Sequence, residues 1–254
     1  MKPMSPMSSP ERADAAGRRI DAAMILAAGL GTRMRPLTDD RPKPLVEVAG
    51  KALIDWNRDR LIAAGVGRIV VNVHYRADQL EAHVRRWREP AATVSDERAA
   101  MLDSGGGVRK ALPLIGDGPF FSLNADTIWM DGPRSNLLRM VEAFDPGRMD
   151  ILLLLASTTT TIGWGNRGDF ALEQDGRVRL PKAGEVAPFA YCGVAILQPR
   201  LFEGTPEVFS LVTLFRRAIE AGRLHGLRLD GVFMHVGTPA AVAEAEQAIA
   251  ASGV

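Results

Sequence analysis

The feature that most constrains the fold is an alternation of short apolar runs with amphipathic segments, which continues from residue 20 to residue 158. The apolar runs have the length and the β-branched or aromatic content of buried strands, and the amphipathic segments repeat apolar residues at intervals of three and four, as helices do. The runs cover residues 20–29, 67–74, 92–97, 119–126 and 149–158. The amphipathic segments cover residues 53–65, 76–87, 106–115 and 135–144. This alternation predicts an α/β fold, with a mostly parallel sheet, helices on both faces and ligands at the carboxyl ends of the strands.

After about Thr158 the pattern changes, and we expect a second, smaller part beside the first. Short strands are expected over residues 169–173, 177–180 and 189–197, and then a helix, a strand pair and a closing helix over residues 211–222, 226–237 and 240–250. No linker is long enough to separate independent domains, so we expect a single domain over residues 20–254, with halves of about 20–157 and 158–254. Residues 1–19 lack the apolar core of a secretory signal and predict a flexible tail.

The composition excludes several classes of function. Of the 254 residues 46% are apolar, which is enough for a sizeable core and excludes disorder for most of the chain. The formal charge of +1 gives no overall field that would attract nucleic acid or an anionic membrane. The single cysteine, Cys192, cannot form an internal disulfide, and no apolar stretch approaches the ~20 residues of a membrane span. We therefore expect a cytoplasmic protein that binds neither nucleic acid nor membrane and holds any anion by local groups.

The stretch GLGTRMRPLTDDRPKPL, residues 29–45, directly follows the first predicted strand. Gly29 and Gly31 permit positive φ and let backbone N–H groups approach a bound anion. Arg33 supplies a planar fork of donors for phosphate oxygens, and Lys43 supplies a point charge on a segment that prolines stiffen. The spacing matches neither G-x-G-x-x-G nor G-x-x-x-x-G-K-[ST], so the dinucleotide fingerprint and the P-loop do not fit. The stretch predicts a phosphate-binding loop of another kind.

Two further segments contain candidate site residues. The fourth predicted strand ends in Asn124-Ala125-Asp126, which places a carboxylate at the carboxyl edge of the sheet, beside the predicted phosphate loop. Asp126 there suits Mg²⁺, which keeps several waters and takes phosphate oxygens as further ligands; a turn or N-cap role is the alternative. The glycine cluster at Gly105–Gly107 lets the backbone lie against a flat ring, although glycine before a helix is also ordinary.

Residues 29–45 resemble the signature of the sugar-1-phosphate nucleotidyltransferases, which reads G-x-G-T-R, then P-L-T, then P-K-P-L. The resemblance extends over nearly all of residues 20–251 and implies a Rossmann-like nucleotidyltransferase fold with a smaller sugar-binding part. It implies an enzyme that joins a nucleoside triphosphate to a sugar 1-phosphate, with Mg²⁺ as cofactor and with Arg33, Lys43 and Asp126 as catalytic residues. The nucleotide is then expected to contact Ala27, Ala28, Gly29, Gly31, Thr32, Arg33, Lys43, Gly105 and Gly106.

Three shorter pieces are most similar to the N-acetylmuramate-1-phosphate uridylyltransferase branch of this family. They are LDSGGG, like its E-T-G-G-G, GNRGDFAL, like its N-P-x-G-D-F, and FAYCGVAILQPRLF, like its sugar-side strand followed by P-x-L-F. The resemblance implies UTP and N-acetylmuramate 1-phosphate as favoured substrates, in the recycling of cell-wall sugars. It also implies that Asn124 contacts substrate, that Asn166 lies near the sugar phosphate and that Tyr191 lies near the sugar. Core packing is the alternative role for Tyr191.

The chain departs from the family pattern near its end. The family reads W-x-D-x-G-T-P, with its aspartate as a second protein ligand to the metal, whereas residues 233–239 read FMHVGTP and place His235 at that position. Neutral imidazole is a poor ligand for Mg²⁺ and a better one for Mn²⁺. His235 is therefore a candidate metal ligand beside Asp126, and packing or a hydrogen bond to phosphate is the alternative. A mannose-1-phosphate guanylyltransferase, another nucleotide and sugar pair, and a catalytically weak nucleotide-sugar sensor stay open as functions.

Overall fold

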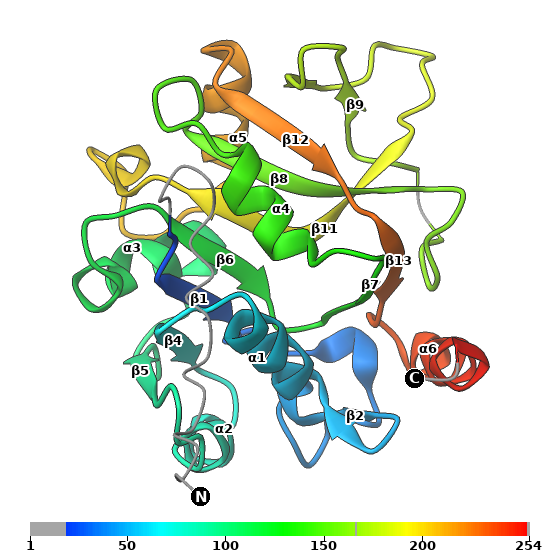
Figure 1. Ribbon diagram of the computed structural model, residues 1–254. Helices are drawn as coiled ribbons and strands as arrows, with labels where there is room; N and C mark the ends of the chain where they lie inside the picture. The colour runs from blue at the N-terminus through cyan, green and yellow to red at the C-terminus, as the bar shows by residue number, and fades with distance from the viewer. Residues whose placement is uncertain (1–18, 166, 253–254) are drawn as a thin grey trace, which may run out of the picture.

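A seven-stranded sheet forms the centre of the structure, a computed structural model that describes residues 19–165 and 167–252 (Figure 1). In the order β12-β8-β11-β6-β1-β4-β5, the strands are Leu224–Arg228, Ile151–Ser157, Phe189–Leu197, Phe120–Asn124, Ala22–Leu26, Arg68–Val73 and Ala92–Asp96. β1 pairs in parallel with β4 and β6, β4 with β5, and β8 with β12, whereas β11 runs antiparallel to β6 and β8. The predicted α/β fold with a mostly parallel sheet is confirmed.

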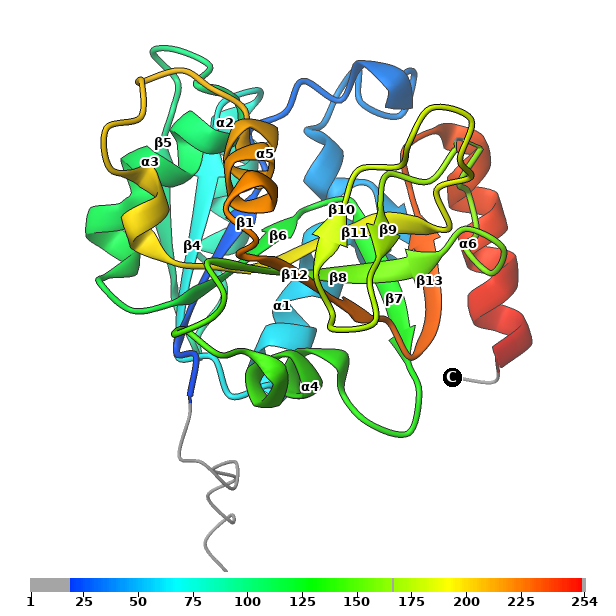
Figure 2. The same ribbon diagram turned by 90° about the horizontal axis from the view of Figure 1, so that it is seen from above.

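Helices cover both faces of this sheet, and successive side chains of β1 point into the two apolar cores between the sheet and these helices. Ala23 and Ile25 face a cluster that includes apolar side chains of α1, α2 and α4, and Ala22 and Met24 face a cluster that includes those of α3 and α5. The helices are α1 Leu53–Ala63, α2 Ala77–Val84, α3 Asp103–Ile115, α4 Asn136–Ala143, α5 Leu211–Glu220 and α6 Pro239–Ser252. Figure 2 shows α5 and α4 on opposite sides of the sheet. The predicted helices on both faces are therefore present.

A smaller layer extends from the carboxyl end of β6. The strand β7, Thr127–Asp131, follows β6 after two residues and pairs antiparallel with β13, Gly231–His235. The hairpin of β2, Glu47–Val48, and β3, Lys51–Ala52, packs with this pair and with α6 around a third apolar cluster. This layer includes Met34 from the segment after the glycine loop, so it supports the edge of the sheet where ligands are expected.

The prediction that two strands within residues 226–237 pair with each other is wrong. Two strands lie in that region, but β12 pairs with β8 and β13 pairs with β7. Between them the N–H of Asp230 donates to Oδ1 of Asn136 at 2.9 Å, and its carbonyl oxygen accepts from the N–H of Gly132 at 2.9 Å. These bonds direct the chain toward β7, so β13 does not turn back onto β12.

The sheet continues across the boundary that the sequence places near residue 157, since β11 and β12 belong to it together with β1. The division into two halves stays a prediction. The expected short strands are present as β9, Ala171–Leu172, and β10, Val178–Arg179, which form an antiparallel pair. Residues 1–18 of the expected tail lie outside the described residues. Within the described ranges no helix combines the length and the apolar character that crossing a membrane requires.

Candidate active site

The glycine loop, residues 27–31, connects β1 to a short 3₁₀ helix, Thr32–Met34. Gly31 has a φ of 66°, and a Cβ there would lie 3.0 Å from the Cβ of Lys43, so glycine allows both the left-handed turn and the close approach. The hydroxyl of Thr38 holds the loop by donating to the carbonyl oxygen of Gly31 at 2.9 Å. Of the two glycines that permit a positive φ, Gly31 adopts one and Gly29 does not. A Cβ at Gly29 would meet nothing within 4 Å, so its backbone faces open space.

Lys43 and Asp126 form an ion pair at the centre of the site. Lys43 begins a 3₁₀ helix, Lys43–Leu45, and Asp126 lies between β6 and β7. Nζ of Lys43 is 2.5 Å from Oδ2 of Asp126, and the side chains are 15% and 19% exposed. Burial alone would raise the pKa of Asp126, but the charge and hydrogen bond of Lys43 outweigh it and hold the pKa below its ordinary value. Asp126 is therefore a carboxylate at neutral pH.

A cavity of about 430 Å³ opens beside this ion pair. It brings together most of the predicted nucleotide and substrate residues, namely Ala27, Gly29, Gly31, Thr32, Arg33, Lys43, Asn124 and Asp126. Ala28 is buried and does not line it. Arg33 is exposed, and its guanidinium has no ion-pair partner among the described residues. Arg33 and Lys43 both line this cavity, so it suits an anion held between two cations. No Ser, Cys or His of the described ranges lines it, so none of these side chains is placed there as a nucleophile.

The carboxyl end of β6 is held by neighbours on two sides. The carbonyl oxygen of Asn124 accepts a hydrogen bond from Nδ2 of Asn57, a buried residue of α1, at 3.3 Å. On the other side is Gly193 of β11, whose φ is 71°. A Cβ at Gly193 would lie 2.9 Å from Nδ2 of Asn124 and 2.5 Å from Oγ1 of Thr127. Glycine at this position therefore makes room for the residues on both sides of Asp126.

The register of β13 on β7 places His235 close to Asp126. His235 pairs with Thr127, the residue after Asp126. The imidazole lies edge-on to the ring of Trp164 with centroids 5.3 Å apart. A Cβ at Gly237 would lie 2.6 Å from Nε2 of His235, so the glycine gives the imidazole its space. The ring also lines a second cavity of about 490 Å³, which shares Arg33 with the first.

The charge state of His235 follows from its surroundings. Burial lowers the pKa of His235, the charge of Asp126 opposes this, and the charges of Lys43 and Arg33 lower the pKa further. Asp169 also opposes the lowering but is the smallest of these influences. His235 is therefore a neutral imidazole at pH 7, in the position where the family pattern has a charged carboxylate.

Asp169 lines neither cavity but acts on the charge of His235, and the sequence did not single it out. The backbone N–H of Tyr191 donates to Oδ2 of Asp169 at 2.8 Å. Burial raises the pKa of Asp169, while the Tyr191 hydrogen bond and the charge of His235 oppose the rise. Its position in the G-D-F segment was the available signal. Its electrostatic coupling to His235 depends on the approach of segments far apart in the chain.

The residues near Asp126 fit a divalent cation only in part. Asp126 supplies one carboxylate and His235 one neutral imidazole. Within the described part of the chain no group of three or more His, Cys, Asp or Glu side chains could hold a metal ion. The site therefore fits a cation that takes its remaining ligands from substrate oxygens and water, as Mg²⁺ does at phosphate sites.

Gly105 and Gly106 lie in the first turn of α3 and do not line the cavity of the glycine loop. Their N–H groups donate to the carbonyl oxygen of Phe209 at 2.8 and 3.0 Å. A Cβ at Gly105 would lie 2.4 Å from the ring of Phe209, and one at Gly106 would lie 2.2 Å from the carbonyl oxygen of Glu207. The two glycines thus admit the segment before α5, and their contact with a nucleotide stays a prediction.

The remaining candidates lie on the sugar side. Tyr191 packs edge-on against Phe215 of α5 with ring centroids 5.5 Å apart, and burial raises the pKa of its hydroxyl. This is the packing alternative for Tyr191, and its contact with a sugar stays a prediction. Asn166 lies outside the described residues. Cys192 is buried, and burial raises the pKa of its thiol well above the ordinary value, which makes it unreactive.

Several known proteins are similar to this chain. The family described as nucleotidyl transferase matches residues 22–161. The N-acetylmuramate alpha-1-phosphate uridylyltransferase of Caulobacter vibrioides is 50% identical over 90% of this chain and 96% of that protein, and the one of Neisseria meningitidis serogroup B is 35% identical over 88% and 96%. A mannose-1-phosphate guanyltransferase of Hypocrea jecorina is 39% identical over 85% of this chain and 60% of that protein. The crystal structure of a UDP-glucose pyrophosphorylase complexed with UDP-glucose has the same fold, with a TM-score of 0.77 and 18% identity over 92% of this chain and 99% of that chain.

Proposed function

The chain belongs to the nucleotidyl transferase family, and from this premise we propose that it transfers a uridylyl group from UTP to N-acetylmuramate 1-phosphate. The observation that carries the proposal is the single cavity in which the glycine loop, Arg33, Lys43 and Asp126 meet. The choice of base and sugar is supported by the identity to the Caulobacter uridylyltransferase over nearly the full length of both chains. Because the reaction consumes a nucleoside triphosphate, we place it in the cytoplasm, in the recycling of cell-wall sugars.

The proposed reaction requires no covalent bond to the protein. An oxygen of the sugar phosphate attacks the α-phosphorus of UTP in line and forms a new P–O bond. The bond from the α-phosphorus to the oxygen that bridges to the β-phosphate breaks, and pyrophosphate leaves with that electron pair. Catalysis then depends on positioning and on the stabilisation of developing negative charge.

The side chains of the cavity divide these tasks. Arg33, which has no ion-pair partner among the described residues, is available to hold the β- and γ-phosphates. Lys43 is available to bind the reacting phosphates. If its ammonium group turned from Asp126 to these phosphates, Asp126 would be released from the ion pair. Asp126 and His235 would then hold Mg²⁺ or Mn²⁺ together with phosphate oxygens, and the bound cation would supply positive charge beside the reacting phosphate. The carboxyl end of β6, with Asn124, lies on the same cavity and is proposed to contact substrate.

One observation favours a second candidate function. Replacement of the second family carboxylate by His235 weakens the protein's share of the metal site and fits a sensor that binds nucleotide sugars with little turnover. The retention of Arg33 and Asp126 favours the enzyme, because a binding module has no clear need for a leaving-group cation and a metal carboxylate together. Mannose-1-phosphate guanylyl transfer is less favoured, since the Hypocrea guanyltransferase is matched over only 60% of its length.

A screen of pyrophosphate release tests the proposal. UTP, GTP, CTP and dTTP are each combined with a panel of sugar 1-phosphates, with Mg²⁺ and with Mn²⁺. We expect UTP with N-acetylmuramate 1-phosphate to give the highest kcat/KM. Turnover of GTP at least about tenfold above UTP, a difference of about 1.4 kcal/mol, would replace the proposed substrates while leaving the family unchanged. Binding of UDP-sugars without turnover of any pair would favour the sensor.

A further inference from the structure

Asn72 and Glu97 connect the glycine loop to the start of α3 through buried hydrogen bonds. Asn72 lies in β4 and is 3% exposed, and Glu97 follows β5 and is 1% exposed. Oδ1 of Asn72 accepts from the N–H of Ala27 at 2.6 Å, and Nδ2 of Asn72 donates to Oε1 of Glu97 at 2.8 Å. The backbone N–H of Leu102, just before α3, lies near the carboxylate of Glu97 and acts to lower its pKa. A chain of hydrogen bonds therefore runs from Glu97, ahead of α3, through Asn72 to the first residue of the glycine loop.

This arrangement fixes the orientation of the Asn72 amide. The N–H of Ala27 is buried and needs an acceptor, so Asn72 must present its oxygen to Ala27 and its NH₂ group to the opposite side. The carboxylate of Glu97 suits that NH₂ group because an ionised carboxylate only accepts hydrogen bonds. A reversed amide would place NH₂ against the N–H of Ala27 and a carbonyl oxygen against the carboxylate. Glu97 thus selects the orientation that holds Ala27.

Gly107 of α3 lies directly against the side chains of Asn72 and Glu97. A Cβ at Gly107 would lie 2.7 Å from Oε1 of Glu97 and 2.9 Å from Nδ2 of Asn72. The third glycine of the cluster therefore gives space to the pair. Because the interior is closely packed, the pair has little freedom to rearrange without moving α3 or the glycine loop.

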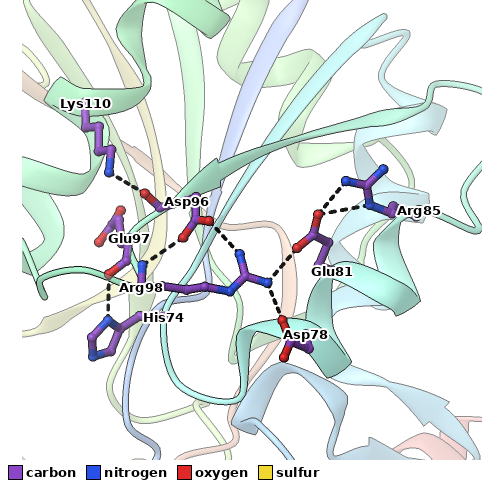
Figure 3. A network of polar contacts seen from close by, with 8 residues as sticks. All are labelled: His74, Asp78, Glu81, Arg85, Asp96, Glu97, Arg98 and Lys110. Carbon is purple, nitrogen blue, oxygen red and sulfur yellow. Dashed lines mark hydrogen bonds and ion pairs between the residues drawn. The ribbon is translucent and has the colours of Figure 1, made fainter.

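Figure 3 shows that the charged groups around Glu97 contact groups other than its carboxylate. The ring of His74 contacts the backbone carbonyl oxygen of Glu97 at 2.8 Å, and Lys110 donates to the backbone carbonyl oxygen of Asp96. Arg98 binds three carboxylates, those of Asp78, Glu81 and Asp96. The Glu97 carboxylate has no ion-pair partner within the described ranges. Burial raises its pKa, and the hydrogen bond of Asn72, the nearby N–H of Leu102 and the charges of Lys110 and His74 oppose the rise.

We propose that Asn72 and Glu97 are positioning residues, which hold Ala27 and the glycine loop in the conformation that binds the triphosphate. The inference rests on the proposed function of the cavity. Ala27 lines that cavity beside Gly29 and Gly31, whereas Asn72 and Glu97 do not line it. Both residues therefore act through Ala27 and not by contact with the substrate.

A reciprocal exchange of the two functional groups tests this role. Asn72→Asp alone sets two carboxylates face to face, and Glu97→Gln alone removes the charge and one of the two acceptor oxygens that face the Asn72 NH₂ group and the nearby Leu102 N–H. Each change should raise the KM for UTP about tenfold or more, because a buried donor or charge loses its partner, and should change the KM for the sugar phosphate less than about twofold. The double variant exchanges amide and carboxylate, restores every hydrogen bond of the chain and keeps its volume and charge. Its KM for UTP should return to within about threefold of the wild type.

Two controls separate this role from others. Asp96→Asn removes the same charge from the neighbouring residue, whose carboxylate pairs with Arg98, and should leave the KM for UTP within about twofold. Inorganic triphosphate has no base, so its inhibition constant should rise together with the KM for UTP in each single variant. The proposal is overturned if the double variant is as impaired as the single variants. It is also overturned if Glu97→Gln weakens UTP but not inorganic triphosphate, since Glu97 would then contact the base.

Calorimetry with inorganic triphosphate distinguishes this inference from the proposed function. A wild-type protein that binds triphosphate without turning over UTP would remove the proposed function alone, and the affinities of the variants would still decide the role of the pair. If a single variant does not fold, the double variant decides. A folded double variant with wild-type affinity supports the pairing, and a folded one with affinity reduced about tenfold overturns it.

Discussion

The ion pair of Lys43 and Asp126 allows the effect of removing the lysine to be worked out from the structure. The two side chains are only 15% and 19% exposed, so Lys43→Ala leaves a largely buried carboxylate without its cation. Breaking a fully buried pair in this way costs about 3–5 kcal/mol, and the exposure that remains here lowers the expected loss to about 2 kcal/mol of unfolding free energy at pH 7. In the enzyme, removal of one charge-stabilising donor should lower kcat about 100-fold or more.

The loss of stability should shrink in acid. With Lys43 present, the pKa of Asp126 is below its ordinary value of 3.8, so the carboxylate contributes stability above that pH, which is lost as the pH falls through the depressed pKa. Without Lys43, burial remains as the largest influence and should raise the pKa of Asp126 above 3.8. The charged carboxylate then destabilises the variant at neutral pH, and protonation relieves it. The difference between wild type and Lys43→Ala should therefore decrease as the pH is lowered from 7 toward about 4.

Urea unfolding at both pH values measures these differences. Lys51→Ala is the matched control, because Lys51 pairs with Asp59 while 33% and 48% of the two side chains are exposed, and its loss should stay within about 0.5 kcal/mol. Adding Asp126→Asn to Lys43→Ala removes the unpaired charge and should restore most of the lost stability without restoring activity. A Lys43→Ala variant no less stable than Lys51→Ala would contradict a stabilising role of the ion pair, and so would an added Asp126→Asn that does not restore stability at pH 7.

Arg33→Ala should lower kcat/KM about 100-fold while changing the unfolding free energy by less than about 0.5 kcal/mol, because Arg33 is exposed; an unfolded variant in circular dichroism would assign it a structural role instead. Gly31→Ala should lose about 1–2 kcal/mol of stability through its positive φ, whereas Gly29→Ala should keep its stability and lose triphosphate affinity; equal melting temperatures for the two would contradict this. His235→Asp should lower the Mg²⁺ concentration needed for half-maximal rate if His235 is a metal ligand, and an unchanged metal titration would leave packing as its role.

The order of strands and helices could be predicted because each buried run and each amphipathic face is a local pattern. The strand β7 was not predicted, although Ile128 and Trp129 within it are buried. It follows β6 after only two residues, and the predicted strand ended at Asp126, so the short run after it was not assigned to a strand of its own. Its partner β13 is more than a hundred residues away, and only the packed fold decides that β13 pairs with β7 and not with β12. Local patterns do not contain that choice.

For the candidate site, too, the local features could be predicted from the sequence and the long-range contacts could not. The loop motif indicated Arg33 and Lys43, and the strand end indicated Asp126, because charge and position relative to the sheet are local properties. The ion pair between Lys43 and Asp126 was not predicted, since it joins residues 83 positions apart. The same applies to Asp169, whose influence on His235 requires the smaller layer to be assembled. The tight approach of Gly107 to Glu97 likewise depends on how α3 packs on β4 and β5.

The exchange of a carboxylate for His235 changes the balance of charges in the cavity region and not only the metal ligands. With a neutral imidazole at position 235, Lys43 pairs with Asp126, and burial raises the pKa of Asp169. An aspartate at position 235 would add a further negative charge next to the proposed triphosphate site. The histidine therefore weakens the attraction for a cation but also lowers the repulsion of the triphosphate, and charges in a partly buried site act strongly on each other. Under the proposed function, we expect such a site to depend more on Arg33, Lys43 and the glycine loop for holding the nucleotide. The proposed support of Ala27 by Asn72 and Glu97 would then matter more to catalysis.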